Sequence, residues 1–308
     1  MGLEKIVRFF SRAYAGGWGV KIFGLLCSML LLVASGCGYD VTETTTYHAA
    51  NWTSDGKIIA RRLTQKHGKN LISNSIPMGS SEELVLMNED GSGEHKLFGV
   101  DENIIKLIEM SPQGTYVGYI NGNGELKVYT RGGALVGRVT PDPPVTHFKF
   151  SPDETKIYGS EDYASMVLFS VSDLSVLSQN SLGGGGGFTD NENVFFYKTS
   201  SGSGGISVYT IANQQMEEFY QGFIPEIYIA SENAVYGLGS DKVYRYELGA
   251  ASYTEVGFSW GPYEANDFTG KHLRGDGGRL VMGDAFENGG IGIFILNVES
   301  GSGIVRIR

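Results

Sequence analysis

The five histidines are the side chains of this sequence best suited to holding a transition metal. They stand at His48, His67, His95, His147 and His272. A metal hydrolase of the His-Glu-x-x-His type needs two histidines four residues apart on one helix face, and no two are that close here. His147 and His272 each lie near a predicted inner strand. For both, a surface position or a satisfied place on the strand is the more frequent explanation, so we assign no metal ligand and no catalytic residue.

The segment Asn88–Gly93 resembles a calcium-binding loop, because oxygen-bearing side chains alternate and Gly93 occupies the sixth position. A complete loop of the EF-hand type also needs a bidentate acid at the twelfth position, which here is Gly99. No helical pattern flanks the segment. We therefore expect a turn that connects two strands.

Two further kinds of active site are not indicated. The run Gly183–Gly187 lacks the Lys and Ser or Thr that complete a phosphate-binding loop, and it does not open a predicted helix. Serine hydrolases of the prolyl oligopeptidase type carry their nucleophile on a strand-to-helix turn in a separate α/β domain. No helical pattern follows the strands of this chain. We expect no cofactor and no enzymatic activity.

The aromatic side chains Phe258, Trp260 and Tyr263 cluster around Pro262 in a predicted loop. Exposed aromatic side chains in loops often anchor protein or sugar contacts. The alternative is a loop that folds over a sheet edge and buries the same side chains. The sequence leaves both open, and the three aromatics form a candidate interaction loop.

Residues 1–36 have the parts of a secretory signal. The basic residues of its head are Lys5, Arg8, Arg12 and Lys21. The apolar run Ile22–Ala34 is short for a membrane span, which takes about 20 apolar residues. Small residues then precede Cys37. The segment resembles the lipobox of bacterial lipoproteins, which implies cleavage before Cys37 and acylation of that residue with lipid such as palmitate.

Alternatives to this interpretation stay open. An uncleaved signal anchor would leave Cys37 without lipid, and a start at Val20 would make residues 1–19 an artefact of start assignment. The residue after Cys37 is Gly38 rather than Asp. In lipoproteins of Gram-negative bacteria an Asp there favours retention in the inner membrane. The resemblance therefore implies an outer-membrane anchor, with the protein facing the periplasm.

Composition narrows the function classes once the signal is removed. The formal net charge of the chain is −10, and without residues 1–36 it becomes about −13. Nucleic-acid binding is not indicated, because it needs a clustered positive field. Only Cys37 remains after Cys27 leaves with the signal, so no disulfide is expected. An acidic surface favours partners with basic surfaces.

A repeat runs through the rest of the chain. Its turn markers are Asp55, Gln113, Asp153, Asn191, Glu232 and Asp276. They are separated by 58, 40, 38, 41 and 44 residues, and about 40 residues is the span of a four-stranded propeller blade. A polar insert, Gln65–Ser81, lengthens the first repeat. Short apolar or alternating runs between the markers predict strands.

The first copies carry a family resemblance. Trp52–Ala60 reads Trp-Thr-Ser-Asp-Gly-Lys-Ile-Ile-Ala, and Leu84–Gly93 follows as Leu-Val-Leu-Met-Asn-Glu-Asp-Gly-Ser-Gly. This pairing is similar to the TolB-like, or WD-like, propeller repeat, with its Trp-Ser-Pro-Asp-Gly-Lys turn. The likeness extends to about residue 180 and covers the propeller only. Departures from the pattern include Gln113 in place of Asp and Glu154 in place of Gly.

The 45 glycines, roughly double ordinary usage, fit this pattern. Many lie in predicted hairpin turns, where positive φ angles are needed. We expect Gly183–Gly187 and Ser200–Gly205 to be flexible links. The strand-like Thr42–Tyr47 could pair with the last blade or serve as a stalk, and the sequence favours neither.

These observations predict an all-β chain folded as a six-bladed β-propeller of four-stranded antiparallel blades. Residues 1–36 are assigned to the signal, 37–48 to an acylated tether and 49–308 to the propeller. We expect a membrane-anchored, non-catalytic scaffold that binds other envelope proteins. The alternative is a propeller that binds or acts on a carbohydrate or other small ligand at its central channel.

Overall fold

A computed structural model describes most of the chain that follows the predicted signal. The residues it describes are 40–69, 76–100, 105–161, 165–181, 183–200, 203–221, 227–229, 232–238, 242–257, 268–273, 279–285, 293–297 and 302–306. They form strands and turns, and no α-helix occurs among them. Consistently, the described residues include no helix long and apolar enough to cross a membrane. The prediction of an all-β chain is confirmed.

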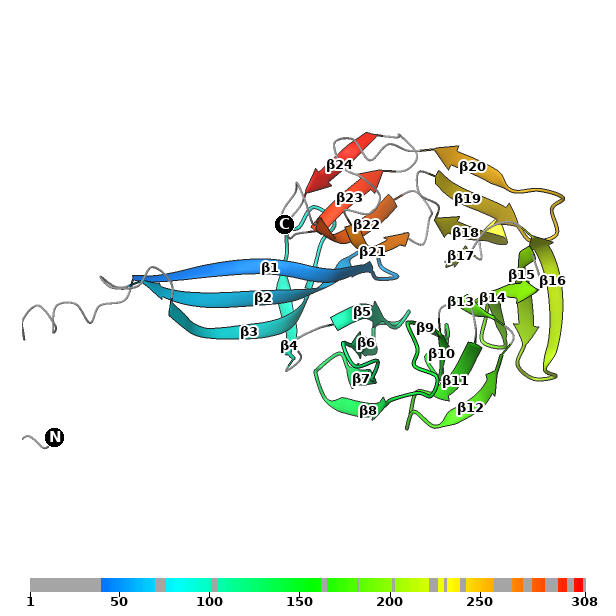
Figure 1. Cartoon of the computed structure of the whole chain (residues 1–308), viewed down its shortest axis with the longest axis horizontal. Coiled ribbons are helices and arrows are strands. Elements are labelled where there is room, and N and C mark those ends of the chain that lie inside the picture. Colours follow the sequence, from blue (N-terminus) through cyan, green and yellow to red (C-terminus); the bar gives the residue numbers. More distant parts are fainter. Residues whose placement is uncertain are drawn as a thin grey trace, which may run out of the picture. The chain divides into compact units, whose positions relative to one another are not determined.

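The strands form six four-stranded sheets, each made of consecutive strands (Figure 1). Sheet 1 contains β1 (Asp40–Trp52), β2 (Ile58–Lys69), β3 (Ile76–Met87) and β4 (His95–Gly99). Sheet 2 contains β5 (Ile105–Met110), β6 (Tyr116–Asn121), β7 (Leu126–Thr130) and β8 (Leu135–Val139). Sheet 3 contains β9 (His147–Phe150), β10 (Lys156–Glu161), β11 (Ser165–Ser170) and β12 (Val176–Asn180). Sheet 4 contains β13 (Gly184–Phe188), β14 (Asn193–Ser200), β15 (Ser203–Thr210) and β16 (Gln215–Gln221). Sheet 5 contains β17 (Ile227–Ile229), β18 (Ala234–Leu238), β19 (Lys242–Glu247) and β20 (Thr254–Gly257). Sheet 6 contains β21 (Phe268–Leu273), β22 (Arg279–Ala285), β23 (Ile293–Asn297) and β24 (Ser302–Arg306).

The chain divides into two compact units, which we describe separately. Unit 1 comprises Met1–Thr44 and Thr64–Ser80. Its described part is a ribbon formed by portions of β1, β2 and β3, with an ion pair of 2.7 Å between Lys66 Nζ and Glu43 Oε1. The insert predicted at Gln65–Ser81 therefore consists largely of strand. Unit 2 comprises Thr45–Leu63 and Ser81–Arg308.

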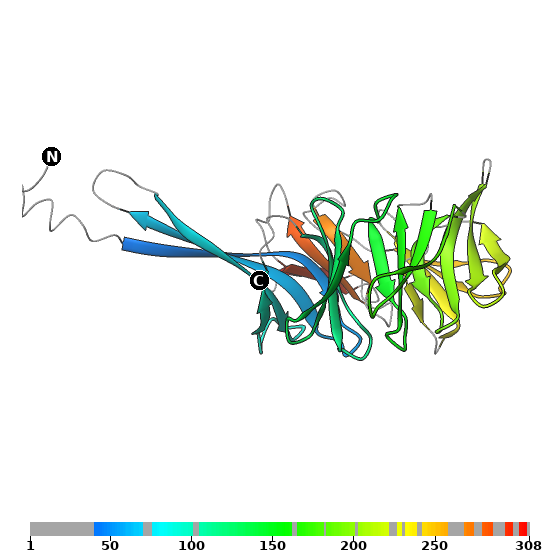
Figure 2. The same ribbon diagram turned by 90° about the horizontal axis from the view of Figure 1, so that it is seen from below.

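In unit 2 the sheets surround a common centre (Figure 1), and Figure 2 shows their strands from the side. The first strand of a sheet, such as β5, β9 or β13, lies nearest the centre, and the last strand, such as β8 or β12, lies farthest from it (Figure 1). Neighbouring strands with a determined register pair antiparallel, for example β10 with β11 and β6 with β7. This is the arrangement of a β-propeller.

In the first and third copies a hydroxyl group stabilises the repeat turn. In the third copy, the Lys156 N–H donates to Ser151 Oγ over 2.9 Å, while this hydroxyl donates to Asp153 Oδ1 over 2.7 Å. In the first copy, Thr53 Oγ1 makes the equivalent bond to Asp55 Oδ1 over 2.6 Å. These local bonds replace those of a strand ladder and reverse the chain.

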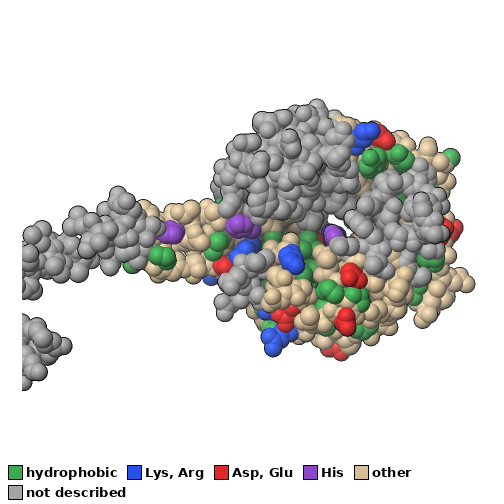
Figure 3. All heavy atoms as spheres, in the orientation of Figure 1, with side chains coloured by type: hydrophobic (Ala, Val, Ile, Leu, Met, Phe, Trp, Pro, Cys, Tyr) green, Lys and Arg blue, Asp and Glu red, His purple; other side chains and the backbone are tan. Residues whose placement is uncertain are grey.

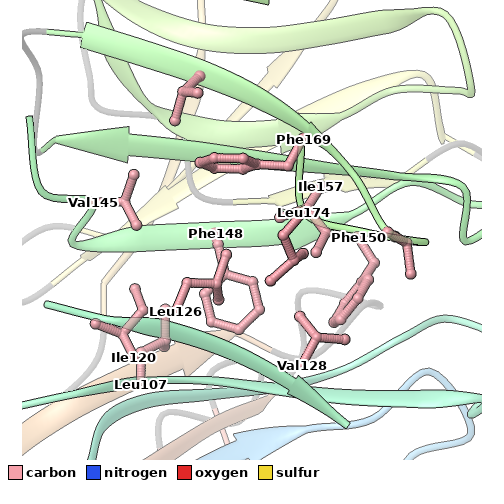
Figure 4. Packing of buried hydrophobic residues seen from close by; sticks show 12 residues of the cluster. Leu107, Ile120, Leu126, Val128, Val145, Phe148, Phe150, Ile157, Phe169 and Leu174 are labelled. Carbon is pink, nitrogen blue, oxygen red and sulfur yellow. The ribbon is translucent and has the colours of Figure 1, made fainter. Parts of the chain in front are cut away.

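Apolar side chains between neighbouring sheets form the core of unit 2. Between sheets 2 and 3, Phe148 and Phe150 pack on Leu126 and Val128 (Figure 4). The two phenylalanine rings meet edge to face, with centroids 5.9 Å apart. A Cβ at Gly118 would lie only 2.7 Å from the Phe148 ring, so glycine at this strand position lets the ring approach.

A similar cluster joins the first sheet to the last. Trp52 and Ile58 of sheet 1 belong to the same buried cluster as Val281 and Ile295 of sheet 6. The segment Thr42–Tyr47, for which pairing with the last blade was one prediction, is part of β1 and pairs with β2 inside sheet 1. Among the described strands, side-chain packing therefore connects the two ends of the series.

The prediction of a flexible link at Gly183–Gly187 was wrong. Gly184–Phe188 is β13, and its glycines are buried. Gly185 accepts a hydrogen bond of 2.6 Å from the Tyr158 hydroxyl. Gly186 has φ +94°, and a Cβ there would lie 2.1 Å from the Phe195 carbonyl oxygen. The glycines are thus required by close packing and by a left-handed backbone. Within Ser200–Gly205, likewise predicted as a link, β15 begins at Ser203.

Candidate functional site

The predicted lipid attachment site and the predicted interaction loop lie outside the described part of the chain. These are Cys37, the predicted lipid attachment site, and the candidate interaction loop with Phe258, Trp260 and Tyr263. The tether assigned to residues 37–48 overlaps the structure from Asp40, where β1 begins. The acylation and the interaction loop therefore stay predictions.

The structure reveals a polar row on the innermost strands, formed by Asn51 of β1, Glu109 of β5 and Lys149 of β9. Lys149 Nζ donates to both carboxylate oxygens of Glu109, over 3.1 and 2.9 Å. Asn51 Nδ2 donates to Glu109 Oε2 over 2.6 Å and to the Ile108 carbonyl oxygen over 2.9 Å. We call Asn51, Glu109 and Lys149 the inner row.

The inner row repeats one position of the sequence. Asn51, Glu109 and Lys149 each precede the apolar residue that comes before a repeat turn. The fourth copy has Gly187 at this position, and a Cβ there would lie 3.0 Å from Lys149 Cγ. An alignment of the repeats could therefore have predicted that these three residues lie close together. The sequence of a single copy does not predict the ion pair.

The inner row is largely shielded from water, which sets its electrostatics. The side chains of Glu109 and Lys149 are 13% and 27% exposed. Burial raises the pKa of Glu109, while the charge and hydrogen bonds of Lys149 and the hydrogen bond from Asn51 oppose that rise. The carboxylate has three side-chain hydrogen bonds from its own chain, so the arrangement favours a structural contact over a free catalytic base.

Neither candidate histidine is part of a described metal site. His147 is exposed on β9, and its Nδ1 lies 3.0 Å from Thr146 Oγ1. The backbone of His272 pairs with Val281 on β22, which places it on inner strand β21. Figure 3 shows a hollow near the centre of unit 2 with a histidine side chain at its border. Within the described ranges, no three His, Cys, Asp or Glu residues come together to hold a metal.

On one face of unit 2 the repeat turns are linked from sheet to sheet. Ser54 Oγ of the first turn donates to the Pro112 carbonyl oxygen of the second. The Asp153 N–H of the third turn donates to Asn191 Oδ1 of the fourth over 2.8 Å. The turn markers read from the sequence thus contribute to contacts between sheets as well as to their own turns.

Two departures from the repeat pattern join the second and third turns. Glu154 has φ +59°, a left-handed conformation that the usual glycine would adopt without strain. Its Oε1 accepts hydrogen bonds from the Gln113 N–H over 2.7 Å and the Thr115 N–H over 3.4 Å. Burial acts to raise the pKa of Glu154, but these bonds and one from Ser111 outweigh it and lower the pKa.

The outermost strands of sheets 2 and 3 expose apolar side chains. Leu135 on β8 is 52% exposed, and Val176 and Leu177 on β12 are 54% and 52% exposed. Val139 of β8 and Val176 line the same groove of about 160 Å³. We call Leu135, Val176 and Leu177 the outer apolar patch. The sequence did not identify it, because a strand's apolar residues do not reveal which strand ends a sheet.

The letters of a nucleophile elbow, Gly-x-Ser-x-Gly, occur once, at Gly257–Gly261. A working elbow lies on a sharp turn from a strand into a helix. Gly257 does end strand β20, but Phe268–Leu273, the next described segment, is strand β21. Residues 258–267 lie outside the described part of the chain. The match of letters therefore carries no assignment of a nucleophile.

Comparison with known proteins supports the fold. No family model matches the sequence, and no curated protein matches it. Among solved structures, Hsv2 of Kluyveromyces lactis has a TM-score of 0.52 at 11% identity, over 83% of this chain and 74% of that chain. A TolB-type protein of Agrobacterium tumefaciens has a TM-score of 0.50 at 14% identity, over 70% of this chain and 84% of that chain.

A third match is the β-propeller domain of a trilobed protease from Pyrococcus furiosus, with a TM-score of 0.46 at 12% identity, over 85% of this chain and 82% of that chain. Identities this low indicate the fold alone. Together with the four-stranded sheets of unit 2, the first two matches establish a β-propeller fold. The blade count stays a prediction, to which the six sheets in the described residues correspond.

Proposed function

We propose that this protein is a lipid-anchored lipoprotein of the bacterial envelope whose propeller is a non-catalytic scaffold for protein–protein interaction. The outer apolar patch is the observation that carries the proposal. Leu135, Val176 and Leu177 are each more than half exposed, and a groove lies between their strands. Exposed apolar side chains beside a groove offer contact area to a partner.

The energetics of the patch suit a protein partner. Completing the burial of one large apolar side chain that is half exposed contributes about 1 kcal/mol. Three such side chains supply a useful part of an interface that also needs polar contacts at its rim. A rigid propeller keeps the patch in place without an ordering cost on binding.

The inner row supports the proposal that the protein is not an enzyme. Glu109 is held by Lys149 and Asn51, and a carboxylate engaged in this way is not available as a general base. The alternative, a carbohydrate or other small ligand bound at the channel, would have to rely on exposed groups such as His147. No second observation among the described residues favours it.

Crosslinked capture from envelope membranes tests the scaffold. We expect Val176→Asp to lower recovery of the partner severalfold, because it places a charge in the outer apolar patch. The matched control is Val256→Asp, which changes a valine 42% exposed on outer strand β20 and should leave recovery unchanged. Equal recovery with both variants, or saturable binding of an envelope glycan without any protein partner, would contradict the proposal.

The anchor is tested separately. Acylation at Cys37, sorting to the outer membrane and a domain facing the periplasm rest on the lipobox resemblance and on Gly38. A lipid chain holds a protein at a membrane through burial of its methylene groups. Replacing Cys37 with Ser should therefore release the protein into the soluble fraction. Continued sedimentation of the Cys37→Ser protein with membranes would overturn the anchor.

A further inference from the structure

A cleft between sheets 4 and 5 is a described site that the proposed function does not use. It has a volume of about 380 Å³, within the range of small-ligand sites. Its walls come from β14, β15 and β16 of sheet 4, from β17 of sheet 5, and from the turns that follow β13, β17 and β19. All of these elements belong to unit 2.

The floor of the cleft is apolar and aromatic. Phe219 of β16 and Tyr228 of β17 are each half-buried along it, and both pack on the buried cluster between sheets 4 and 5. The Tyr228 hydroxyl donates to Asn233 Oδ1 over 2.9 Å, which fixes the ring at the wall. Aromatic faces of this kind attract cations and pack against methylene chains.

The rim of the cleft is acidic. Asp190 and Glu217 both line it, and the lining residues include no Lys or Arg. The Asp190 carboxylate is already engaged, since it accepts hydrogen bonds from the Glu192 N–H over 2.7 Å and from the Asn193 side chain over 2.8 Å. Glu217 is exposed, and its carboxylate makes no ion pair or hydrogen bond to the described residues.

From this arrangement we infer that the cleft between sheets 4 and 5 binds a Lys or Arg side chain of a basic segment in the partner protein. Glu217 supplies the counter-charge, and the aromatic floor contacts the methylene chain and the cationic group. The cleft has room for one such side chain with its neighbours. The inference rests on the proposed scaffold function and names a second contact, apart from the outer apolar patch.

Charge favours a cation over a neutral sugar. Carboxylates also accept hydrogen bonds from sugar hydroxyls, so charge is what separates the two ligands here: the lining has two acidic groups and no basic one. An acidic rim instead rejects anions and attracts basic segments. The net charge of about −13 after removal of the signal acts in the same direction.

The test is binding of a fluorescein-labelled hexa-arginine peptide to the full chain in detergent, measured by anisotropy. Ionic strength is kept physiological, where screening acts over about 8 Å and suppresses distant charges. We expect Glu217→Gln to weaken binding about five- to tenfold, the loss typical of one charge-assisted contact. The control is Glu218→Gln, which removes the same charge one residue away on β16.

The control is matched because neighbouring residues of a strand point to opposite faces. Glu217 lies opposite Val208 in the register, and both line the cleft. Glu218 lies opposite Ser207 and is exposed, and neither residue lines the cleft. We expect Glu218→Gln to change the dissociation constant less than twofold.

Three outcomes would overturn the inference. The first is equal weakening by Glu217→Gln and Glu218→Gln, which would indicate attraction by the overall charge. The second is an absence of saturable peptide binding. The third is displacement of the peptide by the neutral sugar maltohexaose. The proposed function would survive each of these results, since its own test is partner capture with Val176→Asp, outside the cleft.

Discussion

The inner row and the cleft between sheets 4 and 5 both contain carboxylates, but they differ in what neutralises them. Glu109 is held by Lys149 and Asn51 from two other sheets. Glu217 is exposed and is bound by none of the described residues. The ion pair of Glu109 across sheets stabilises the propeller, whereas the exposed carboxylate of Glu217 can bind a cationic group of a partner. The same residue type thus serves stability in one place and recognition in another.

The largest expected effect comes from breaking the inner row. Lys149→Met should lower the free energy of unfolding by about 2–3 kcal/mol, because it leaves Glu109 shielded without its counter-charge; partial exposure keeps the loss below that of a fully buried pair. Urea denaturation measures it. The control is Lys106→Met, which changes an exposed lysine on inner strand β5. An equal loss in both variants would mean that the ion pair contributes nothing specific.

A smaller effect is expected at Glu154, a second carboxylate bound within the chain. Glu154→Gln keeps an acceptor oxygen but removes the charge, and should cost about 1 kcal/mol at neutral pH. Because folding lowers the pKa of Glu154 below its ordinary value of 4.5, its stabilisation is present above that value and is lost as the pH falls through the folded-state pKa.

Unfolding curves at neutral pH and at about pH 3 check this sign. The difference in stability between the wild type and Glu154→Gln should shrink on acidification. A difference that stays constant or grows would contradict the charged hydrogen bonds at this turn.

The smallest effect is expected in the cleft. Glu217→Gln should change the free energy of unfolding by less than about 0.5 kcal/mol, as is usual for an exposed side chain. Glu218→Gln on the same strand gives the comparison. If Glu217→Gln lost as much stability as Lys149→Met, the contrast between the two regions would fail.

Much of the fold could be predicted because turn chemistry is local. Ser151 and Asp153 stabilise their turn through hydrogen bonds to residues only a few positions away. The repeat and its strands can therefore be predicted from the sequence. The prediction for Gly183–Gly187 was wrong because its glycines are needed for contacts with residues that are distant in the sequence. The Phe195 carbonyl oxygen, which leaves no room for a Cβ at Gly186, lies on another strand.

The sites were less predictable, for the same physical reason. Glu109 and Lys149 are 40 residues apart, and only the alignment of the repeats brings them together. The outer apolar patch depends on which strand ends each sheet, and the cleft depends on how two sheets diverge. Neither property is encoded in the spacing of a few residues.

The most direct test measures stability and peptide binding on the same two variants. Our account predicts opposite profiles. Lys149→Met should lose about 2–3 kcal/mol of stability yet bind hexa-arginine like the wild type under folding conditions, whereas Glu217→Gln should keep its stability and bind about five- to tenfold more weakly. If both variants lost stability and binding together, the division between charges that hold the propeller and charges that serve a partner would be wrong.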